Sequence, residues 1–83
     1  MANLELHGAR FEFNIALDDL YLWQQRLRQF VHEAETYSPE AFEVSLRHLN
    51  CEIHRASKNA FAKLCEFQRT LREEADDRGN PLA

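Results

Sequence analysis

A length of 83 residues, a formal charge of −4 and only two cysteines exclude several classes of protein. The chain holds one domain at most, and it lacks the strongly basic balance typical of a nucleic-acid-binding domain. Cys51 and Cys65 are too few for the disulfide framework of a small secreted protein. With 45% apolar and 29% charged residues, the composition is typical of a globular chain.

The N-terminus lacks the basic region and apolar run of a signal peptide. No stretch approaches the roughly 20 apolar residues that a membrane-spanning helix needs. Cys51 and Cys65 fall in one predicted helix at a separation of about 21 Å, which is too far apart for a disulfide bond. Free thiols are typical of a reducing compartment, so we expect a cytoplasmic protein without a membrane anchor.

Residues 3–15 are predicted to form a β-hairpin. Apolar and polar residues alternate over 4–6 and again over 9–13, which is the pattern of half-buried strands. Gly8 falls between the two runs, where a two-residue turn needs a positive φ. An isolated hairpin is only marginally stable in water, so its apolar face must pack on a helix or on another chain.

A first helix is predicted over residues 18–37. Asp18 and Asp19 can cap its N-terminus and suit the positive end of the helix dipole. Apolar residues then follow at spacings that place them on one face of the helix: Leu20, Trp23, Leu27, Phe30, Val31 and Ala34. Ser38 and Pro39 end this helix and begin the next, as the N-cap and the first helical residue.

A second, very long helix is predicted over residues 39–78, with 79–83 as a tail. Apolar residues recur along it at steps of three and four. This stripe consists of Phe42, Leu46, Leu49, Ile53, Ala56, Ala60, Leu64, Phe67, Leu71 and Ala75. A helix of roughly 40 residues is about 60 Å long, whereas a compact chain of this size is only about 30 Å across.

The predicted fold is therefore a mainly α single domain over residues 1–83, a β-hairpin followed by a helical hairpin. The first helix can shield only about half of the stripe, so we expect a dimeric helix bundle in which the long helices of two copies pair. Two alternatives remain open. The long helix can break in its middle, or the stripe can serve only as the core of one three-element domain.

Two further groups on the helices are candidates for partner binding. The first is a set of apolar side chains off the stripe: Tyr21, Trp23, Phe61 and Cys65. The alternative is that the β-hairpin covers it. The second is a basic row opposite the stripe: Arg47, Arg55, Lys58, Arg69 and Arg72. Such a row can bind phosphates or an acidic protein, although an ordinary solvated face is the favoured interpretation.

His48, Cys51 and His54 raise the possibility of a metal site, with His32 and Glu35 as further ligands. One Cys/His pair falls short of the two closely spaced pairs typical of zinc sites, so we expect neither a metal nor another cofactor. The sequence contains no Gly-rich phosphate loop, nucleophile elbow or His-Glu-x-x-His motif. A thin bundle also offers no substrate pocket, so we do not expect an enzyme.

The expected function is that of a small regulatory or inhibitory protein. It would form a homodimer and would sequester or adapt another protein through apolar helix faces. A bacterial or phage adaptor, antiactivator or immunity-type inhibitor fits its size and acidity. One alternative is a dimeric nucleic-acid-associated regulator that uses the basic row, and another is a structural assembly subunit.

Overall fold

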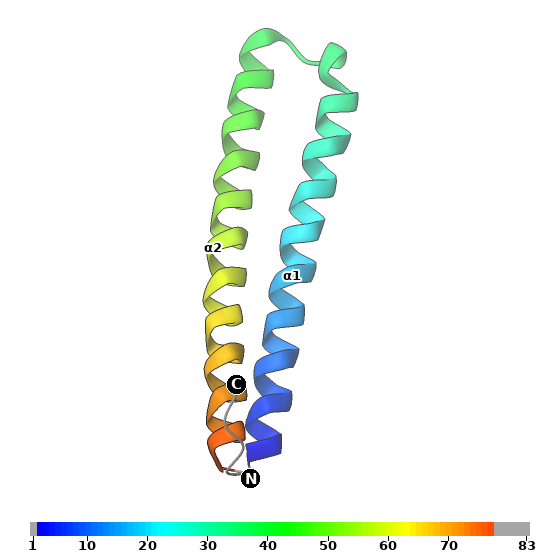
Figure 1. Ribbon diagram of the computed structural model, residues 1–83. Coiled ribbons are helices and arrows are strands. Elements are labelled where there is room, and N and C mark those ends of the chain that lie inside the picture. Colours follow the sequence, from blue (N-terminus) through cyan, green and yellow to red (C-terminus); the bar gives the residue numbers. More distant parts are fainter. Residues whose placement is uncertain (1, 78–83) are drawn as a thin grey trace.

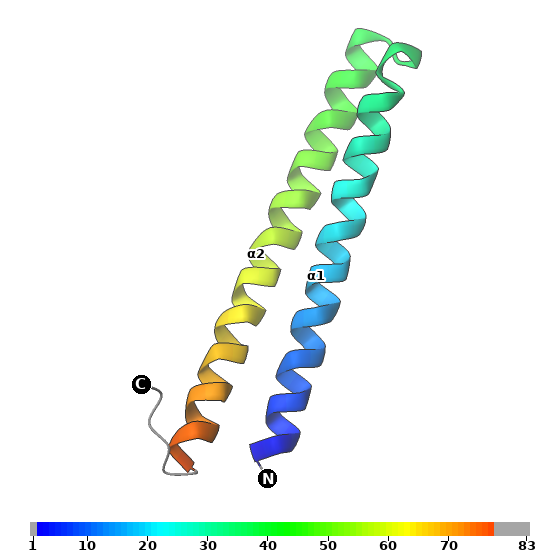
Figure 2. The ribbon, with the colours of Figure 1, turned by 45° about the vertical axis from the view of Figure 1, so that its right-hand side comes forward.

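The computed structural model describes residues 2–77 as an antiparallel pair of long helices (Figure 1). Helix α1 spans Ala2–His32 and helix α2 spans Pro39–Asp77, with the short 3-10 helix η1, Ala34–Thr36, in the connection. The helices lie side by side along their length in both views (Figure 2). The result is a rod of 61 × 19 × 15 Å. Its radius of gyration is 18.5 Å, against about 12 Å for a compact chain of this length.

The β-hairpin predicted over residues 3–15 is wrong, because these residues form the first half of α1. The described part of the chain contains no strand. Apolar residues at spacings of three and four run through this segment and on to the end of α1: Leu6, Ala9, Phe13, Ala16, Leu20, Trp23, Leu27 and Phe30. Gly8 lies inside the helix, and no atom lies within 4 Å of the position that a Cβ would take there.

The predicted start of the first helix at residue 18 is also wrong, since α1 already begins at Ala2. Asp18 and Asp19 lie within the helix instead of capping it. At the other end α1 stops at His32, and η1 and an extended residue, Tyr37, lead into α2. The Tyr37 ring packs edge-on against Phe30 with 4.9 Å between ring centroids, which ties the connection to the helix pair.

The long second helix is confirmed, and α2 runs without a break through its middle. Its N-terminus is capped as predicted, because the Ala41 amide donates to Ser38 Oγ at 3.2 Å. Pro39 occupies the first helical position, where its missing N–H costs nothing. The tail predicted over 79–83 lies outside the described residues.

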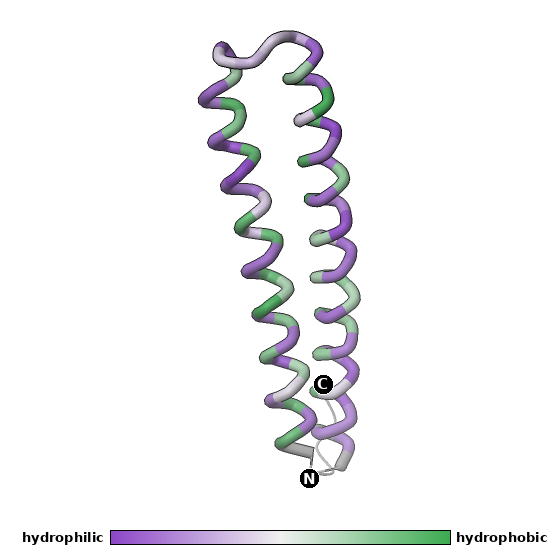
Figure 3. Tube along the Cα trace, turned by 180° about the vertical axis from the view of Figure 1, so that it is seen from behind, coloured by the Kyte–Doolittle hydropathy of each residue, from purple (hydrophilic) through white to green (hydrophobic). Residues whose placement is uncertain are grey.

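The core between the helices is thin. The buried apolar residues are Ala16, Phe30, Leu49, Ala56, Ala60 and Ala75. Alanines let the helix axes approach closely, but each buries little apolar area. Larger rings add to the contact, with Phe30 stacked on Phe42 at 4.8 Å and Phe13 on Phe67 at 6.1 Å. Hydrophobic segments recur along the full length of both helices (Figure 3), so much of the apolar surface lies outside this core.

Candidate interaction surfaces

The apolar stripe of α2 is only partly covered by α1. Leu49, Ala56, Ala60 and Ala75 are buried, and Phe42, Ile53, Leu64 and Phe67 are half-buried. Leu46 and Leu71 remain 37% and 36% exposed, whereas Thr70 beside Leu71 is buried. Helix α1 therefore packs against one edge of the stripe, and the opposite edge is open.

The four apolar partner-binding candidates fall in different environments. Tyr21 and Phe61 are 63% and 58% exposed, and Cys65 is exposed as well. Trp23 instead packs between the helices, edge-on to the His48 ring at 6.0 Å between centroids. The alternative in which a β-hairpin covers this set is wrong, because the described residues form no hairpin. Tyr21, Phe61 and Cys65 thus remain accessible to a partner.

Three members of the basic row form ion pairs with neighbouring carboxylates. Arg47 Nη2 lies 3.2 Å from Glu43 Oε1, and Arg69 Nη1 lies 2.9 Å from Glu73 Oε1. Such exposed pairs between successive helix turns offset the positive charge locally. Lys58 forms no ion pair with any described residue, and the same holds for Arg72. The row therefore presents much less net charge than its sequence indicates.

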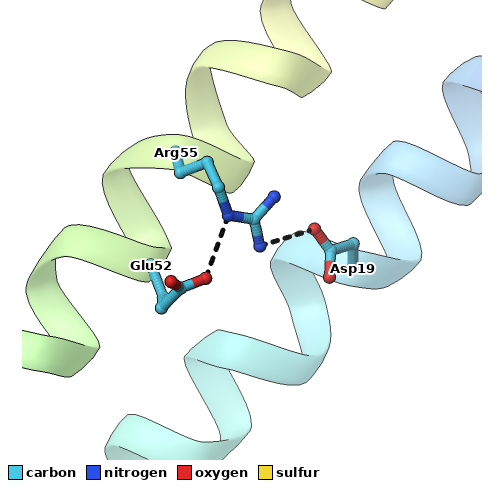
Figure 4. A network of polar contacts seen from close by, with 3 residues as sticks. All are labelled: Asp19, Glu52 and Arg55. Carbon is cyan, nitrogen blue, oxygen red and sulfur yellow. Dashed lines mark hydrogen bonds and ion pairs between the residues drawn. The ribbon is translucent and has the colours of Figure 1, made fainter.

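Arg55, the third of these residues, links the two helices (Figure 4). Its Nε donates to Glu52 at 2.9 Å on the same helix, and its Nη2 donates to Asp19 at 3.2 Å on α1. The bond to Glu52 and the bond to Asp19 raise the pKa of Arg55 above its ordinary value. A second link across the helices joins Lys63 Nζ to Glu12 at 3.5 Å. Both links cross between the antiparallel helices α1 and α2.

A further apolar surface on α1 was missed by the sequence analysis. Leu4, Phe11, Ile15 and Leu22 are 74%, 64%, 52% and 48% exposed, and we call them the outer stripe. Their spacings of seven, four and seven residues place them within about 40° of one another over some 27 Å of helix. They lie on the side of α1 away from α2. The seven-residue spacing is the sequence signal that could have revealed them.

Residues that could carry chemistry do not converge. Among the described residues, no three His, Cys, Asp or Glu side chains are grouped so that they could hold a metal ion. Cys51 and His54 line a shallow hollow on α2 together with Arg47 and Asn50. His32 is the last residue of α1 and does not line this hollow.

No described helix is both long enough and apolar enough to cross a membrane. No protein-family model, curated protein or solved structure matches the chain. The chain's own exposed surfaces are therefore what point to a function.

Proposed function

We propose that this protein is a small regulatory or inhibitory module that binds another protein through apolar helix surfaces. The outer stripe is the observation that carries the proposal. Its side chains point away from α2, so no described part of the chain covers them. Soluble monomeric proteins rarely expose contiguous apolar patches of more than a few hundred Å², and such patches mark interaction sites.

The spacing of the outer stripe suits a partner that presents an apolar helix. Side chains that recur about every seven residues along one helix face pack into those of a second helix laid beside it. Acidic residues flank the stripe: Asp18 lies on one side, whereas Glu12 and Asp19 on the other side already pair with Lys63 and Arg55. A partner helix with basic residues beside its apolar face would complement these charges.

The ion pairs of the basic row support this function over nucleic-acid binding. Arg47, Arg55 and Arg69 already pair with carboxylates of the same chain, so a phosphate backbone would have to compete with them. The proposal needs no free basic surface, because burial of apolar side chains supplies most of the binding free energy.

Recovery of partners from the native cell with a tagged protein tests the proposal. Phe11→Asp places a charge in the outer stripe, and Ala62→Asp adds the same charge at an exposed site on α2 as the matched control. We expect a protein that is recovered with the wild type and with Ala62→Asp but lost with Phe11→Asp. Recovery of the same proteins with all three chains would contradict the proposal.

A further inference from the structure

The helical hairpin has two broad faces, and the ion pairs between the helices cross one of them. Asp19 precedes the core residue Leu20 on α1, and Arg55 precedes the core residue Ala56 on α2; the two side chains meet on one face. Because the helices are antiparallel and each residue turns by about 100°, residues that follow a core position point to the opposite face on both helices. We call the face that holds Asp19 and Arg55 the charged face, and we call the opposite face the open face.

The open face is rich in apolar side chains. Leu17, Tyr21 and Val31 follow the core residues of α1 and are 41%, 63% and 58% exposed. On α2, Phe61 follows Ala60 and Leu71 follows Thr70, and both side chains join the uncovered edge of the stripe. The open face therefore continues the core sideways through residues 17–31 of α1 and residues 61–71 of α2.

The open face also carries polar side chains between its apolar residues. Neutral ones are Gln24, Asn50, Ser57 and Gln68. Arg10 and Arg28 follow the core residues Ala9 and Leu27, so they lie on this face as well. The ion pairs of Asp19 with Arg55 and of Glu12 with Lys63 cross the charged face, which also holds the exposed Ile15 and Leu22.

The size of this face matches what a stable dimer needs. The outline of a rod 61 Å long and 19 Å wide covers roughly 1,200 Å², compared with about 800 Å² per partner in a standard protein interface. The hairpin also has only one layer of contacts, and its buried apolar residues are mostly alanines. Folded domains normally pack two layers around a core, so a second layer of similar length would complete this one.

We propose that the open face binds the open face of a second copy of this chain, which forms a four-helix bundle. A second copy supplies a rod of the required length with the same exposed apolar side chains, and a two-fold axis brings equivalent patches together. Each helix would then contact two neighbours, one through the core positions and one through the open face. The outer stripe stays on the outside of the bundle. This inference rests on the proposed function and names one of the module's partners.

Two variants with the same added charge test the dimer. Ser57→Asp places a carboxylate on the open face, whereas Asn59→Asp places it two residues away on the charged face of the same helix. Both positions are exposed, so neither change disturbs the core, and circular dichroism verifies that the helices persist. Solution mass by light scattering and sedimentation over a concentration series is the measurement.

We expect a wild-type mass near twice 9.8 kDa. Ser57→Asp should raise the dimer dissociation constant on the order of 100-fold, because it buries an unpaired charge in both copies, and Asn59→Asp should leave it unchanged. A monomeric wild type, larger assemblies that grow with concentration, or equal behaviour of the two variants would overturn the inference. Loss of target binding in Phe11→Asp alone would still support the proposed function, so the two failures are distinguishable.

Discussion

Replacement of Gly8 by alanine tests the helical assignment of the N-terminal segment most directly. Gly8 lies six residues into α1, is exposed, and has no atom within 4 Å of an added Cβ. The substitution therefore introduces no clash and changes only the backbone preference. Alanine is favoured over glycine inside a helix by about 0.8–1 kcal/mol, so we expect a gain of roughly that size in the free energy of unfolding. For a chain of this length the midpoint of thermal unfolding should rise by about 5 °C.

Thermal and urea unfolding followed by circular dichroism, at one fixed protein concentration, measures the effect. In a β-hairpin turn Gly8 would need a positive φ, and alanine there would destabilise the protein. A fall in stability would therefore refute the continuous α1. The converse control is Ala62→Gly. Ala62 is exposed to solvent and lies away from the ends of α2, so glycine there should lower the free energy of unfolding by about 1 kcal/mol.

Three further substitutions test the caps, the core and the ion pairs. Ser38→Ala removes the hydroxyl that accepts from the Ala41 amide and should cost about 1 kcal/mol in unfolding by urea. Ala56→Leu forces a larger side chain into a fully buried position where the helices touch and should cost about 1–3 kcal/mol; an unchanged melting temperature would contradict the close approach. Arg55→Ala should leave stability nearly unchanged at physiological salt, because water screens both of its exposed ion pairs.

The second half of the fold could be predicted because its sequence signals agree with one another. Ser38 and Pro39 mark a helix start, no glycine or proline interrupts the segment that follows, and its apolar residues keep one spacing. Local preference and tertiary packing therefore favour the same structure, which is α2. The cap geometry at Ser38 shows that even the first helical residue was correct.

The first half failed because α1 carries apolar residues on more than one side. Leu6, Ala9 and Phe13 belong to the helix core, but they also fit an alternation with Leu4 and Phe11, which lie on the outer stripe. A helix with two apolar sides loses the clear period of 3.6 residues and resembles a strand over short windows. A glycine in the middle of such a window then favours the prediction of a turn, although a helix tolerates glycine at a modest cost in stability.

The interaction surfaces depended on information that periodicity does not contain. The spacing in α2 defines a stripe, but the rotation of α1 about that stripe decides which edge stays open. Apolar packing between the helices, such as Phe13 with Phe67, depends on that rotation. Leu46 and Leu71 therefore lie at the exposed edge despite belonging to the stripe.

The residues that misled the prediction are also those that carry the functional argument. A helix that only had to pack on α2 would need apolar side chains at its core positions alone. Helix α1 adds an outer stripe around Phe11 and an open face around Tyr21, and each exposed apolar surface lowers solubility and favours aggregation. Polar residues at these positions would keep the hairpin contacts and remove that cost. The proposed second copy on the open face and the proposed target on the outer stripe would remove that cost by covering both surfaces.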